Sequence, residues 1–532
     1  MNQHQPVLVL GNGPVGQTAA LLLARWGIPV VVLDGRPARD LVGSKAICQQ
    51  RDVLDIWESV GVGATLAAEG VTWTRARTFY RDDELFTIDF EDPGASPFPP
   101  FVNISQCRTE EVLDDQIDAQ PLIEVRWGHR VIAIAQDAEG VTVACETGAG
   151  EIEVRGSYVL ACPGARGDAI REMLGLSFEG HTFGDQFLIC DLRTDLPGWE
   201  RERRFYFDPQ WNPGRQVLIH PCPDSTFRID WQVPENFELA EEERTGALDA
   251  RIRQIIGDCD YEIVWKSAYR FHSRVVNRMR VGRALLAGDG AHLVAPFGAR
   301  GLNSGVQDAE NAAWKLAYVL NGWAPESLLD TYHHERHAAA LENLEVTGAT
   351  MRFLVPQTEE QWEDRRRTLE AARHDTDARA RVDSGRLAEP FWYVDSPLTT
   401  PDSRGPFAGR PARGTMPTPA PGVLMPDFPV RGADGGETHL RRLLRDGITV
   451  LVGAACSPSV LSQAREGSVG PVQAYAFADL SPALAGVMGA EAAEVWVVRP
   501  DAHVAAVLRD PSPAELTRAL DRVLARGLPA TV

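Results

Sequence analysis

The segment from Val7 to Asp34 constrains the fold more than any other part of the sequence. Its first four residues, Val7 to Leu10, are apolar and predict a buried strand, and glycines 11, 13 and 16 follow at the spacing G-x-G-x-x-G. The alanine-rich stretch from Gln17 to Trp26 then predicts a helix, and the apolar run from Pro29 to Leu33 predicts a second strand. In this strand–loop–helix–strand order, the glycine pattern indicates a dinucleotide-binding unit.

Each part of this unit has its own physical role. Gly11 permits a tight turn, Gly13 lets the backbone approach a pyrophosphate, and Gly16 lets the helix lie close to the strand. The helix N-terminus offers free N–H groups and a positive dipole end to phosphate groups. Asp34 stands at the end of the second strand, where a carboxylate accepts hydrogen bonds from a ribose hydroxyl.

Length and composition narrow the class of protein. A chain of 532 residues is too long for a single core, so we expect two or three domains. The net charge of −21 argues against nucleic acid as a partner. The eight cysteines include no C-x-x-C pair, which indicates buried thiols in a reducing cytoplasm rather than a metal site or a disulfide framework. We find no signal peptide and no run of about 18 apolar residues, so no membrane span is expected.

The character of the sequence changes along the chain. Strands are predicted at 71–90 and in several segments from 122 to 162, the last of them running from 151 to 162. Residues 180–275 are rich in aromatic side chains that alternate with period two, which predicts a mostly antiparallel sheet in a separate module. The stretch from 396 to 421 is dense in Pro, Gly, Arg and Thr and is predicted to be a linker, and 422–532 predicts a small α/β domain.

A second glycine-rich segment follows another short predicted strand. That strand runs from Arg283 to Gly288 and is followed directly by Asp289. The loop from Pro296 to Asn303 then leads into a helical pattern from Ser304 to Leu320. An aspartate at the end of a strand, beside a glycine loop and a helix N-terminus, suits a second anion or dipole contact with the same bound molecule.

Four motifs together resemble a known family. They are G-N-G-P-V-G at 11–16, G-D-x-A-H at 288–292, P-x-G-x-x-G-L-N at 296–303 and D-A-x-N-x-A-W-K-L-A at 308–317. This combination resembles the single-component FAD-dependent aromatic hydroxylases, the class A flavoprotein monooxygenases, and within them the phenol-, hydroxyphenylpropionate- and polyketide-hydroxylase branches. Members of those branches carry a C-terminal thioredoxin-like domain.

The resemblance implies an α/β fold with a discontinuous Rossmann-like, glutathione-reductase-type FAD-binding domain at 1–179 and 276–395. A mostly antiparallel β-sheet substrate domain is inserted at 180–275. After the linker, residues 422–532 would form the thioredoxin-like domain. Because it lacks C-x-x-C, we expect it to have a structural or dimer-contact role rather than thiol chemistry.

The resemblance also implies roles for single residues. The glycines of the first motif would hold the FAD pyrophosphate, Asp34 the adenosine ribose and Asp289 the ribityl chain. The loop with Pro296 would lie against the isoalloxazine ring, and Leu302 and Asn303 would contact its pyrimidine edge through their backbone. The expected cofactor-binding set is Gly11, Gly13, Pro14, Val15, Gly16, Asp34, Gly35, Arg36, Lys45, Ala46, Arg51, Gln106, Asp289, Pro296, Gly298, Gly301, Leu302 and Asn303.

Two positions depart from the family pattern. The family normally has an Asp-Gly pair that contacts FAD and NAD(P)H, whereas this chain has Pro163 and Gly164. We therefore expect the contact with NAD(P)H to be altered more than flavin binding. The glycine-rich loop at 296–303 carries Arg300 where the family usually has Gln. Its guanidinium would favour the anionic reduced flavin, meet an acidic substrate, or point to solvent.

The implied reaction is hydroxylation of a phenolic or polyketide-like aromatic molecule through a flavin C4a-hydroperoxide. It requires tightly bound FAD, transiently bound NADPH or NADH, and dioxygen. A base that forms the phenolate is often His or Tyr, although a lone histidine is more often structural. The candidate catalytic residues are Pro296, Arg300, His220, Arg228, Tyr269 and His272. Baeyer–Villiger insertion or epoxidation by the same flavin is the alternative, and a flavoprotein without oxygenase turnover is a further one.

Overall fold

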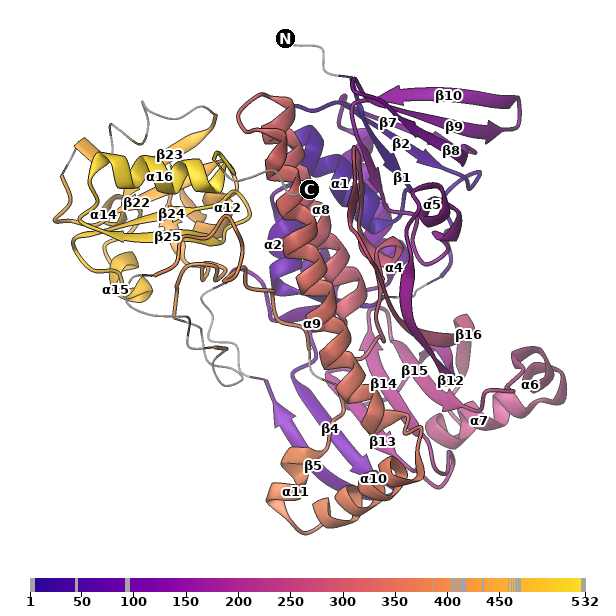
Figure 1. Ribbon diagram of the computed structural model, residues 1–532. Helices are drawn as coiled ribbons and strands as arrows, with labels where there is room; N and C mark the ends of the chain where they lie inside the picture. The colour runs from indigo at the N-terminus through magenta and orange to yellow at the C-terminus, as the bar shows by residue number, and fades with distance from the viewer. Residues whose placement is uncertain are drawn as a thin grey trace.

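The computed structural model describes residues 5–43, 46–90, 96–385, 387–402, 407, 409–410, 418–432, 435–457, 459–460, 462, 464 and 470–527. Figure 1 shows two large sheets joined by long helices, with a smaller domain at the C-terminal end of the chain. The mixed α/β class predicted from the sequence is confirmed. Within this described part, no helix has both the length and the apolar character needed to cross a lipid bilayer.

A six-stranded sheet with the order β17-β18-β11-β1-β2-β7 carries the first glycine motif. Its strands pair in parallel except at β17. They are short and apolar because helices cover both faces of such a sheet. Their bounds are β1 Val7–Leu10, β2 Val30–Asp34, β7 Ile123–Trp127, β11 Val159–Ala161, β17 Arg280–Val281 and β18 Ala284–Leu286. Helices α1 (Pro14–Arg25), α4 (Gln106–Asp118) and α8 (Arg300–Leu320) belong to this part of the molecule.

The stretch from 151 to 162, predicted as one strand, is two strands in different sheets. Strand β10 (Gly150–Gly156) pairs with β9 (Val141–Thr147) beside β8 (Arg130–Gln136), whereas β11 lies in the six-stranded sheet. The chain bends between them, where the Ser157 amide donates to the carbonyl oxygen of Pro6 at 2.9 Å. The prediction was wrong because it ran through Gly156 and Ser157, which favour a turn, and through the change from the charged, alternating pattern of β10 to the apolar pattern of β11.

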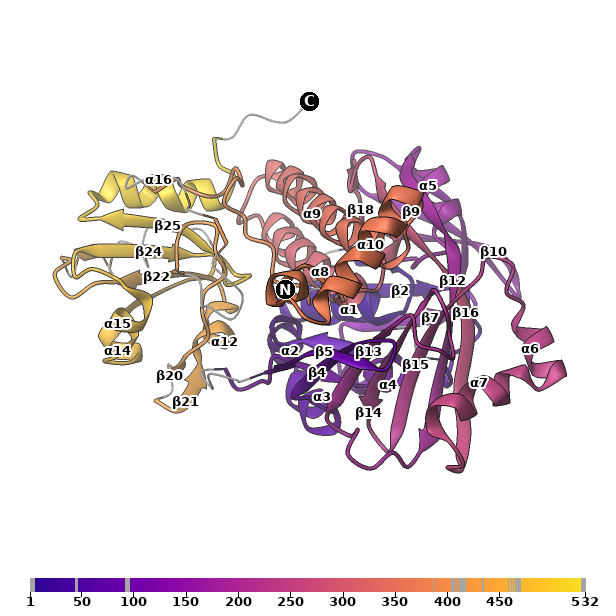
Figure 2. The ribbon, with the colours of Figure 1, turned by 90° about the horizontal axis from the view of Figure 1, so that it is seen from below.

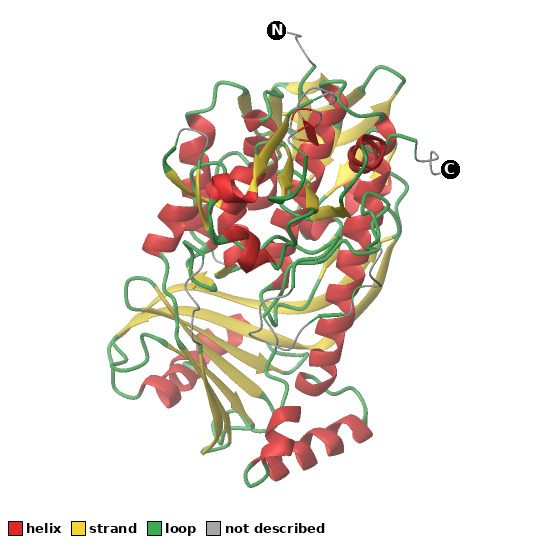
Figure 3. Cartoon of the chain, turned by 90° about the vertical axis from the view of Figure 1, so that its left-hand side faces the viewer, coloured by secondary structure: helices red, strands yellow, loops and turns green. Residues whose placement is uncertain are grey.

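The aromatic-rich module forms an eight-stranded sheet with the order β19-β16-β12-β15-β14-β13-β4-β5, seen as the lower layer in Figure 3. Two of its strands come from much earlier in the chain, and β4 pairs in parallel with β13. The bounds are β4 Arg75–Tyr80, β5 Asp83–Asp89, β12 Phe178–Thr194, β13 Glu202–Phe207, β14 Gln216–Cys222, β15 Thr226–Val233, β16 Tyr261–Val276 and β19 His292–Leu293. One face packs on α7 (Ala247–Ile256), which follows α6 (Leu239–Thr245), and the other faces the rest of the molecule.

Long helices connect these layers. Helix α9 (Asp330–Leu354) runs from the six-stranded sheet toward the eight-stranded one and leads into α10 (Glu359–Ala372) and α11 (Thr376–Arg381) (Figure 1). A short pair, β3 (Cys48–Gln50) and β6 (Phe101–Asn103), also connects the two parts, because the Asn103 side chain donates to the Pro221 carbonyl at 2.9 Å. The remaining short helices are α2 Arg51–Glu58, α3 Gly63–Glu69, α5 Asp168–Met173, η1 Gly288–Gly290 and η2 Glu326–Leu329.

The C-terminal domain lies against α8 and α9 on the side away from the eight-stranded sheet (Figure 2). Its four-stranded mixed sheet has the order β23-β22-β24-β25, with β20 and β21 as a separate pair. Strand bounds are β20 Pro429–Arg431, β21 Glu437–His439, β22 Ile448–Val452, β23 Val472–Ala476, β24 Glu494–Val498 and β25 Val504–Arg509. The helices are α12 Leu440–Leu444, α14 Phe477–Leu480, α15 Leu484–Met488 and α16 Pro513–Val523. Much of the predicted linker, at 403–406, 408 and 411–417, lies outside the described residues.

Candidate active site

The first glycine loop is tightly packed at two of its glycines and open at the third. Gly11 has φ +105°, and a Cβ atom there would lie 2.4 Å from the Cys162 carbonyl oxygen. A Cβ atom on Gly16 would lie 1.9 Å from the Gly11 carbonyl oxygen, so neither position accepts a side chain. A Cβ atom on Gly13 would meet nothing within 4 Å. The open side of the loop therefore lies at the N-terminus of α1, beside Pro14 and Val15.

Asn12 shows that this opening is suited to a polar ligand. Its side-chain nitrogen and oxygen are both buried, and neither has a hydrogen-bond partner among the described residues. Buried polar atoms are normally satisfied, so a ligand group with both donors and acceptors fits here. The first-turn N–H groups of α1 add donors and a positive dipole end. The donor set thus fits the pyrophosphate and sugar of a dinucleotide.

Asp34 is held rigidly at the end of β2. Its carboxylate accepts hydrogen bonds from the backbone N–H groups of Asn12 and Arg36, each at 2.8 Å. It also accepts two from the Arg36 guanidinium, at 2.9 and 3.0 Å. Burial raises the pKa of Asp34, but these hydrogen bonds outweigh burial and leave the pKa below its usual value. The Arg36 guanidinium also lies over the Trp127 ring at 5.4 Å. Gly35, between Asp34 and Arg36, packs on Arg130.

The second glycine motif packs directly on the first. A Cβ atom on Gly305 of α8 would lie 2.6 Å from the Val15 side chain, and one on Gly288 would lie 3.1 Å from it. Small residues on η1 and α8 therefore let both elements approach the first turn of α1. This packing brings the two motifs, almost 300 residues apart, into one site.

Asp308 fixes the G-D-x-A-H segment from inside α8. Its Oδ2 accepts from the Gly288 amide at 3.0 Å and pairs with His292 Nε2 at 2.7 Å, and its Oδ1 pairs with Arg336 Nε at 2.6 Å. Burial alone would raise the pKa of Asp308, but His292 and Arg336 hold it at about 2. Both residues of the His292–Asp308 pair stand in motifs recognised from the sequence, yet their contact was not predicted.

Helix α8 begins at Arg300, four residues before the predicted start. The glycines at 298 and 301 favoured a loop, but the chain enters the helix through Ala299, a left-handed residue with φ 57°. Gly301 and Leu302 are therefore in the first turn, where N–H groups have no partner within the helix. The Asp289 carboxylate lies beside this turn, with Oδ1 3.8 Å from the position of a Cβ atom on Gly301.

The Asn303 side chain attaches α8 to β3. Its Nδ2 donates to the Cys48 carbonyl at 2.9 Å, and its Oδ1 accepts from the Gln50 amide at 3.0 Å. This structural use was not predicted, because sequence reasoning assigned Asn303 only a backbone contact.

The other predicted cofactor residues of the N-terminal part lie around α4 and β6. Gln106 Oε1 accepts from the Ala46 amide at 3.2 Å, so these two candidates are in contact. Arg51 Nε donates to the Phe98 carbonyl at 2.8 Å. Lys45 lies outside the described residues.

Pro163 fills the space between two glycine turns. A Cβ atom on Gly290 would lie 2.6 Å from Pro163 Cδ, and one on Gly167 would lie 2.6 Å from Pro163 Cγ. The proline ring therefore packs against the turn that carries Asp289. An apolar ring at the end of β11 adds no charge to this edge of the sheet.

Arg300 is buried rather than solvent-facing, so the predicted alternative of a solvent-exposed guanidinium was wrong. Its residue exposure is 5%, and Nη1 donates to Asn343 Oδ1 on α9 at 2.7 Å. The side chain reaches α9 because α8 begins at this residue, which directs it between the two helices. A fixed positive charge thus lies at the N-terminus of α8.

Aromatic rings connect the Pro296 loop with the inner face of the eight-stranded sheet. Phe297 packs edge-on against Phe187 and Phe271 at 5.6 and 5.9 Å, and those two rings stack at 4.4 Å. Tyr269 pairs across strands with Phe187 and is 37% exposed. Burial and the nearby Asp289 raise the pKa of the Tyr269 hydroxyl. This face of the sheet is therefore aromatic where it meets the second glycine motif.

Charged groups are buried further along the same face. Arg228 forms a two-pronged ion pair with Asp191 at 2.7 and 2.9 Å, and His220 lies directly opposite Arg228 in the strand register. Burial, with Arg203 and Arg228 nearby, lowers the pKa of His220 far below its usual value, so the ring is uncharged. The structure thus brings the predicted candidates His220 and Arg228 together. Asp191 in this cluster was not predicted, since only the strand register reveals it.

His272 lies apart from this cluster. It contacts Thr182 Oγ1 at 2.9 Å, between Arg270 and Arg274 on β16. Burial and these two arginines lower its pKa. Its local role is the bond to β12.

Comparison with known proteins identifies the family. Residues 4–347 match the family described as "FAD binding domain", and residues 418–527 match "Aromatic-ring hydroxylase, C-terminal". The chain belongs to this family of FAD-binding aromatic-ring hydroxylases. The resemblance drawn from the four motifs is confirmed.

Curated relatives of this flavoprotein are bacterial monooxygenases. The chain is 30% identical over 352 residues to the 3-(3-hydroxy-phenyl)propionate/3-hydroxycinnamic acid hydroxylase of Mycolicibacterium smegmatis, covering 66% of this chain and 61% of that one. It is 32% identical over 355 residues to a flavin-dependent monooxygenase of Mycobacteroides abscessus, covering 63% of this chain and 71% of that one.

Solved structures share the fold of this flavoprotein over nearly its whole length. The flavin-dependent monooxygenase PieE, in complex with FAD and substrate, superposes with a TM-score of 0.85 at 23% identity, covering 99% of this chain and 100% of that one. Aklavinone-11 hydroxylase, in a ternary complex with FAD and aklavinone, superposes with a TM-score of 0.78 at 25% identity over the same shares.

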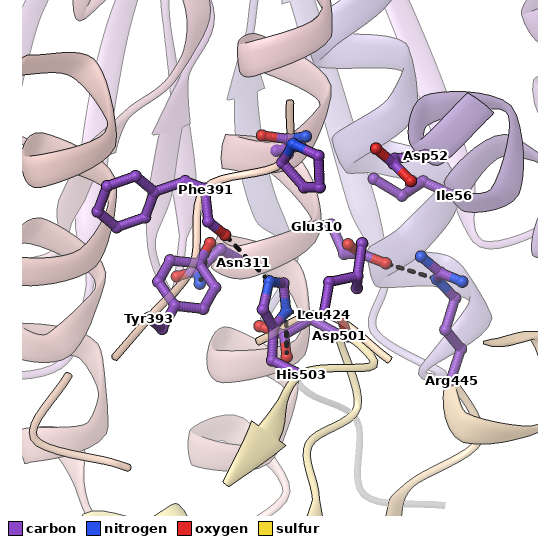
Figure 4. A pocket seen from close by; sticks show the side chains of 12 residues that line it. Asp52, Ile56, Glu310, Asn311, Phe391, Tyr393, Leu424, Arg445, Asp501 and His503 are labelled. Carbon is purple, nitrogen blue, oxygen red and sulfur yellow. Dashed lines mark hydrogen bonds and ion pairs between the residues drawn. The ribbon is translucent and has the colours of Figure 1, made fainter. Parts of the chain in front are cut away.

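A small cavity in this flavoprotein lies between α2, α8 and the C-terminal domain (Figure 4). Its volume is about 20 Å³, which is room for about one water molecule. Polar pairs surround it, including Arg445 with Glu310 at 2.6 Å and His503 with the Phe391 carbonyl at 3.2 Å. An aromatic substrate does not fit here, so this cavity belongs to the domain interface.

Proposed function

We propose that the protein is an FAD-dependent monooxygenase that uses NAD(P)H and dioxygen to hydroxylate a phenolic or polyketide-like aromatic substrate. The observation that carries the proposal is the meeting of three features at one place. The N-termini of α1 and α8 approach each other at Val15, and Asp289 lies beside them. The Phe297 ring connects this place with Phe187 on the face of the eight-stranded sheet. When bound, FAD supplies the redox chemistry and the activation of dioxygen.

In this proposal, the N-terminal site binds the adenosine half of the cofactor. Gly13, Asn12 and the first turn of α1 contact the pyrophosphate, because this is where the loop is open and unsatisfied. The Asp34 carboxylate accepts a hydrogen bond from the ribose hydroxyl, and the Arg36 guanidinium provides a flat cationic surface beside that carboxylate.

The second glycine motif then binds the flavin half. Asp289 contacts the ribityl chain, and the free N–H groups at Gly301 and Leu302 contact the ring edge. The positive end of the α8 dipole and the buried Arg300 charge stabilise negative charge that develops on the ring during reduction. Such fixed charges act without reorganisation in a site from which water is excluded.

The sheet face supports an aromatic substrate. The partly exposed Tyr269 ring, backed by the buried rings of Phe187 and Phe271, offers a flat contact on this face, and charged groups lie further along it. A surface with an aromatic part and a polar end suits a ring that carries hydroxyl groups. The hydroxyaromatic compounds named for the curated relatives favour the same class.

The test begins with the purified full-length protein. We expect a yellow protein that releases FAD on denaturation, and NADPH or NADH oxidation that a phenol accelerates. Resorcinol, 3-(3-hydroxyphenyl)propionate and aklavinone are suitable probes, since they appear in the names of relatives. With labelled dioxygen, one oxygen atom should enter the ring as a hydroxyl.

Other outcomes would contradict the proposal. Oxygen inserted into the carbon skeleton, or an epoxide, would replace hydroxylation by the Baeyer–Villiger or epoxidation alternative. FAD that neither NADH nor NADPH reduces, with or without a probe, would indicate a flavoprotein without oxygenase turnover.

A further inference from the structure

One carboxyl group on the inner face of the eight-stranded sheet stands outside the ion pair beside it. Asp230 follows Arg228 by two residues on β15, so both side chains are on the same face. Arg228 forms its two-pronged ion pair with Asp191. Asp230 Oδ1 is buried and has no hydrogen-bond partner within the described ranges. A buried, unsatisfied carboxyl oxygen is costly and calls for a function.

The strand register places Asp230 next to the aromatic part of the face. It lies opposite Leu218 on β14 and opposite Ile189 on β12. Ile189 is two residues from Phe187, whose ring contacts Phe297 of the flavin loop at 5.6 Å. Residues two apart on a strand are separated by about 7 Å, close to the length of a phenol molecule. Tyr269, the cross-strand partner of Phe187, is the exposed ring here, so a phenol ring packed against Tyr269 can direct its hydroxyl group past Ile189 to Asp230.

The surrounding charges decide how Asp230 titrates. Arg228 and Asp191 lie beside it, Arg203 approaches from β13, His220 is on β14, and the half-buried Cys222 and Cys48 lie close to the arginines. Burial raises the pKa of Asp230 to about 7, with Asp191 adding to the rise and the two arginines opposing it. His220 remains uncharged, and burial raises the pKa of each cysteine to about 12. Asp230 is thus the group of this cluster that exchanges a proton at neutral pH.

We propose that Asp230 accepts the proton of the hydroxyl group on the phenolic substrate. This proposal rests on the hydroxylase function proposed above. The phenol O–H bond breaks, its proton moves to a carboxylate oxygen of Asp230, and the electron pair remains on the phenolate oxygen. The ring carbons become more electron-rich and react faster with an electrophilic oxygen. As the hydroxylated ring loses its C–H proton to solvent and regains aromaticity, the Asp230 carboxylic acid returns its proton to the substrate oxygen.

The test compares Asp230→Asn, Asp230→Glu and the control Glu262→Gln in the FAD-loaded protein. Glu262 is an exposed residue near the end of β16 paired with Arg193, so its loss removes a surface carboxylate and leaves the Arg228–Asp191 pair and Asp230 unchanged. A general base contributes about 100-fold or more, and we expect Asp230→Asn to lose that much of the hydroxylation rate with resorcinol. The wild-type pH–rate profile should fall on the acid side near neutral pH. Asp230→Asn should lose this acid limb and Asp230→Glu should restore part of it, whereas Glu262→Gln should match wild type.

An infrared titration provides a readout that does not depend on turnover. The wild-type minus Asp230→Asn difference spectrum should contain a protonated-carboxyl band that disappears as the pH rises through neutrality. No such band would overturn the proposal, and so would an unchanged acid limb in an Asp230→Asn enzyme that hydroxylates resorcinol at the wild-type rate. Wild-type protein that binds FAD but hydroxylates no probe would contradict the proposed function instead, and the band would still report on Asp230.

Discussion

Arg499 of the C-terminal domain and Glu335 of α9 form a fully buried, two-pronged ion pair, with N–O distances of 2.5 and 2.9 Å. Lys315 of α8 joins the same carboxylate at 2.6 Å, and Asp501 pairs with Arg499 at 2.6 Å. The positive charges of Arg499 and Lys315 thus balance the two carboxylates of Glu335 and Asp501 at the domain interface. This network attaches the C-terminal domain to α8 and α9. It gives that domain a structural role that needs no thiol chemistry.

Replacing Arg499 by Met should destabilise the protein strongly. The change leaves Glu335 and Asp501 buried with one cation fewer, and breaking a buried pair typically costs about 3–5 kcal/mol. The free energy of unfolding in denaturant measures the loss. Arg509→Met is the matched control, because Arg509 pairs with Glu491 at the surface, where about half of each side chain is exposed. Such a pair is worth about 1 kcal/mol at most, so equal losses in the two variants would refute the buried network as a source of stability.

Replacing Asp308 by Asn should weaken the second glycine motif. The amide cannot neutralise Arg336. With its oxygen toward the Gly288 amide and His292, its NH2 group would face the Arg336 guanidinium, so that two donors meet. We expect less FAD to be retained on purification, together with a lower melting temperature. If Asp308→Asn retains FAD as wild type does, the anchor is dispensable.

The same carboxylate makes stability depend on acid. The pKa of Asp308 is lowered to about 2 in the folded protein, whereas an unfolded Asp has a pKa of about 3.9. The stabilisation is therefore complete above about pH 4 and is lost as the pH falls toward 2. Wild type should lose more stability over this window than Asp308→Asn, as measured by denaturant titrations at each pH.

Gly13 and Gly16 should respond differently to the same change. Gly13→Ala meets no protein atom within 4 Å, so the fold should tolerate it, while its methyl group enters the space proposed for the pyrophosphate. We expect FAD affinity to fall about tenfold or more, the cost of about 1.4 kcal/mol, with little change in the melting temperature of the FAD-free protein. Gly16→Ala would place its Cβ 1.9 Å from the Gly11 carbonyl, so it should destabilise the FAD-free fold itself. Identical behaviour of the two variants would contradict the assignment of the open space.

Asp230→Asn should raise stability in a pH-dependent manner. The folded-state pKa of Asp230 is raised to about 7 by burial, so the unfolded state releases its proton first. The cost of the ionised side chain therefore grows as the pH rises from about 4 to 7 and stays constant above that. At mildly alkaline pH the variant should be more stable than wild type by about 4 kcal/mol, and near pH 4 the two should be almost equal. A difference in melting temperature that is independent of pH would refute the raised pKa.

Local patterns in the sequence were sufficient to predict the fold of the first glycine-rich segment. The order of strand, glycine loop, helix and strand at Val7–Asp34 depends on contacts between near neighbours, and such contacts leave a readable pattern. The motif at 288–303 was likewise recognisable. Its glycines predicted a loop up to Asn303, however, whereas α8 begins at Arg300. The family comparison agrees with both.

The substrate half depended on tertiary structure. Alternation along β15 shows that Arg228 and Asp230 share a face, but only the register with β12 and β14 reveals that Asp191 neutralises the first and that Ile189 and Leu218 border the second. Strand β4 pairs with β13 across more than a hundred residues of sequence, and no local pattern encodes that partner.

The sequence by itself determined the family and predicted which glycine-rich segments bind the cofactor, because backbone conformation and helix dipoles are properties of short segments. Tertiary structure decided which charges are compensated: the burial of Arg300 against Asn343, the pairing of His292 with Asp308, and the Arg499–Glu335 bond between domains. Electrostatic energies in a protein interior depend on distance and on exclusion of water, and both are set only when distant segments of the chain come together.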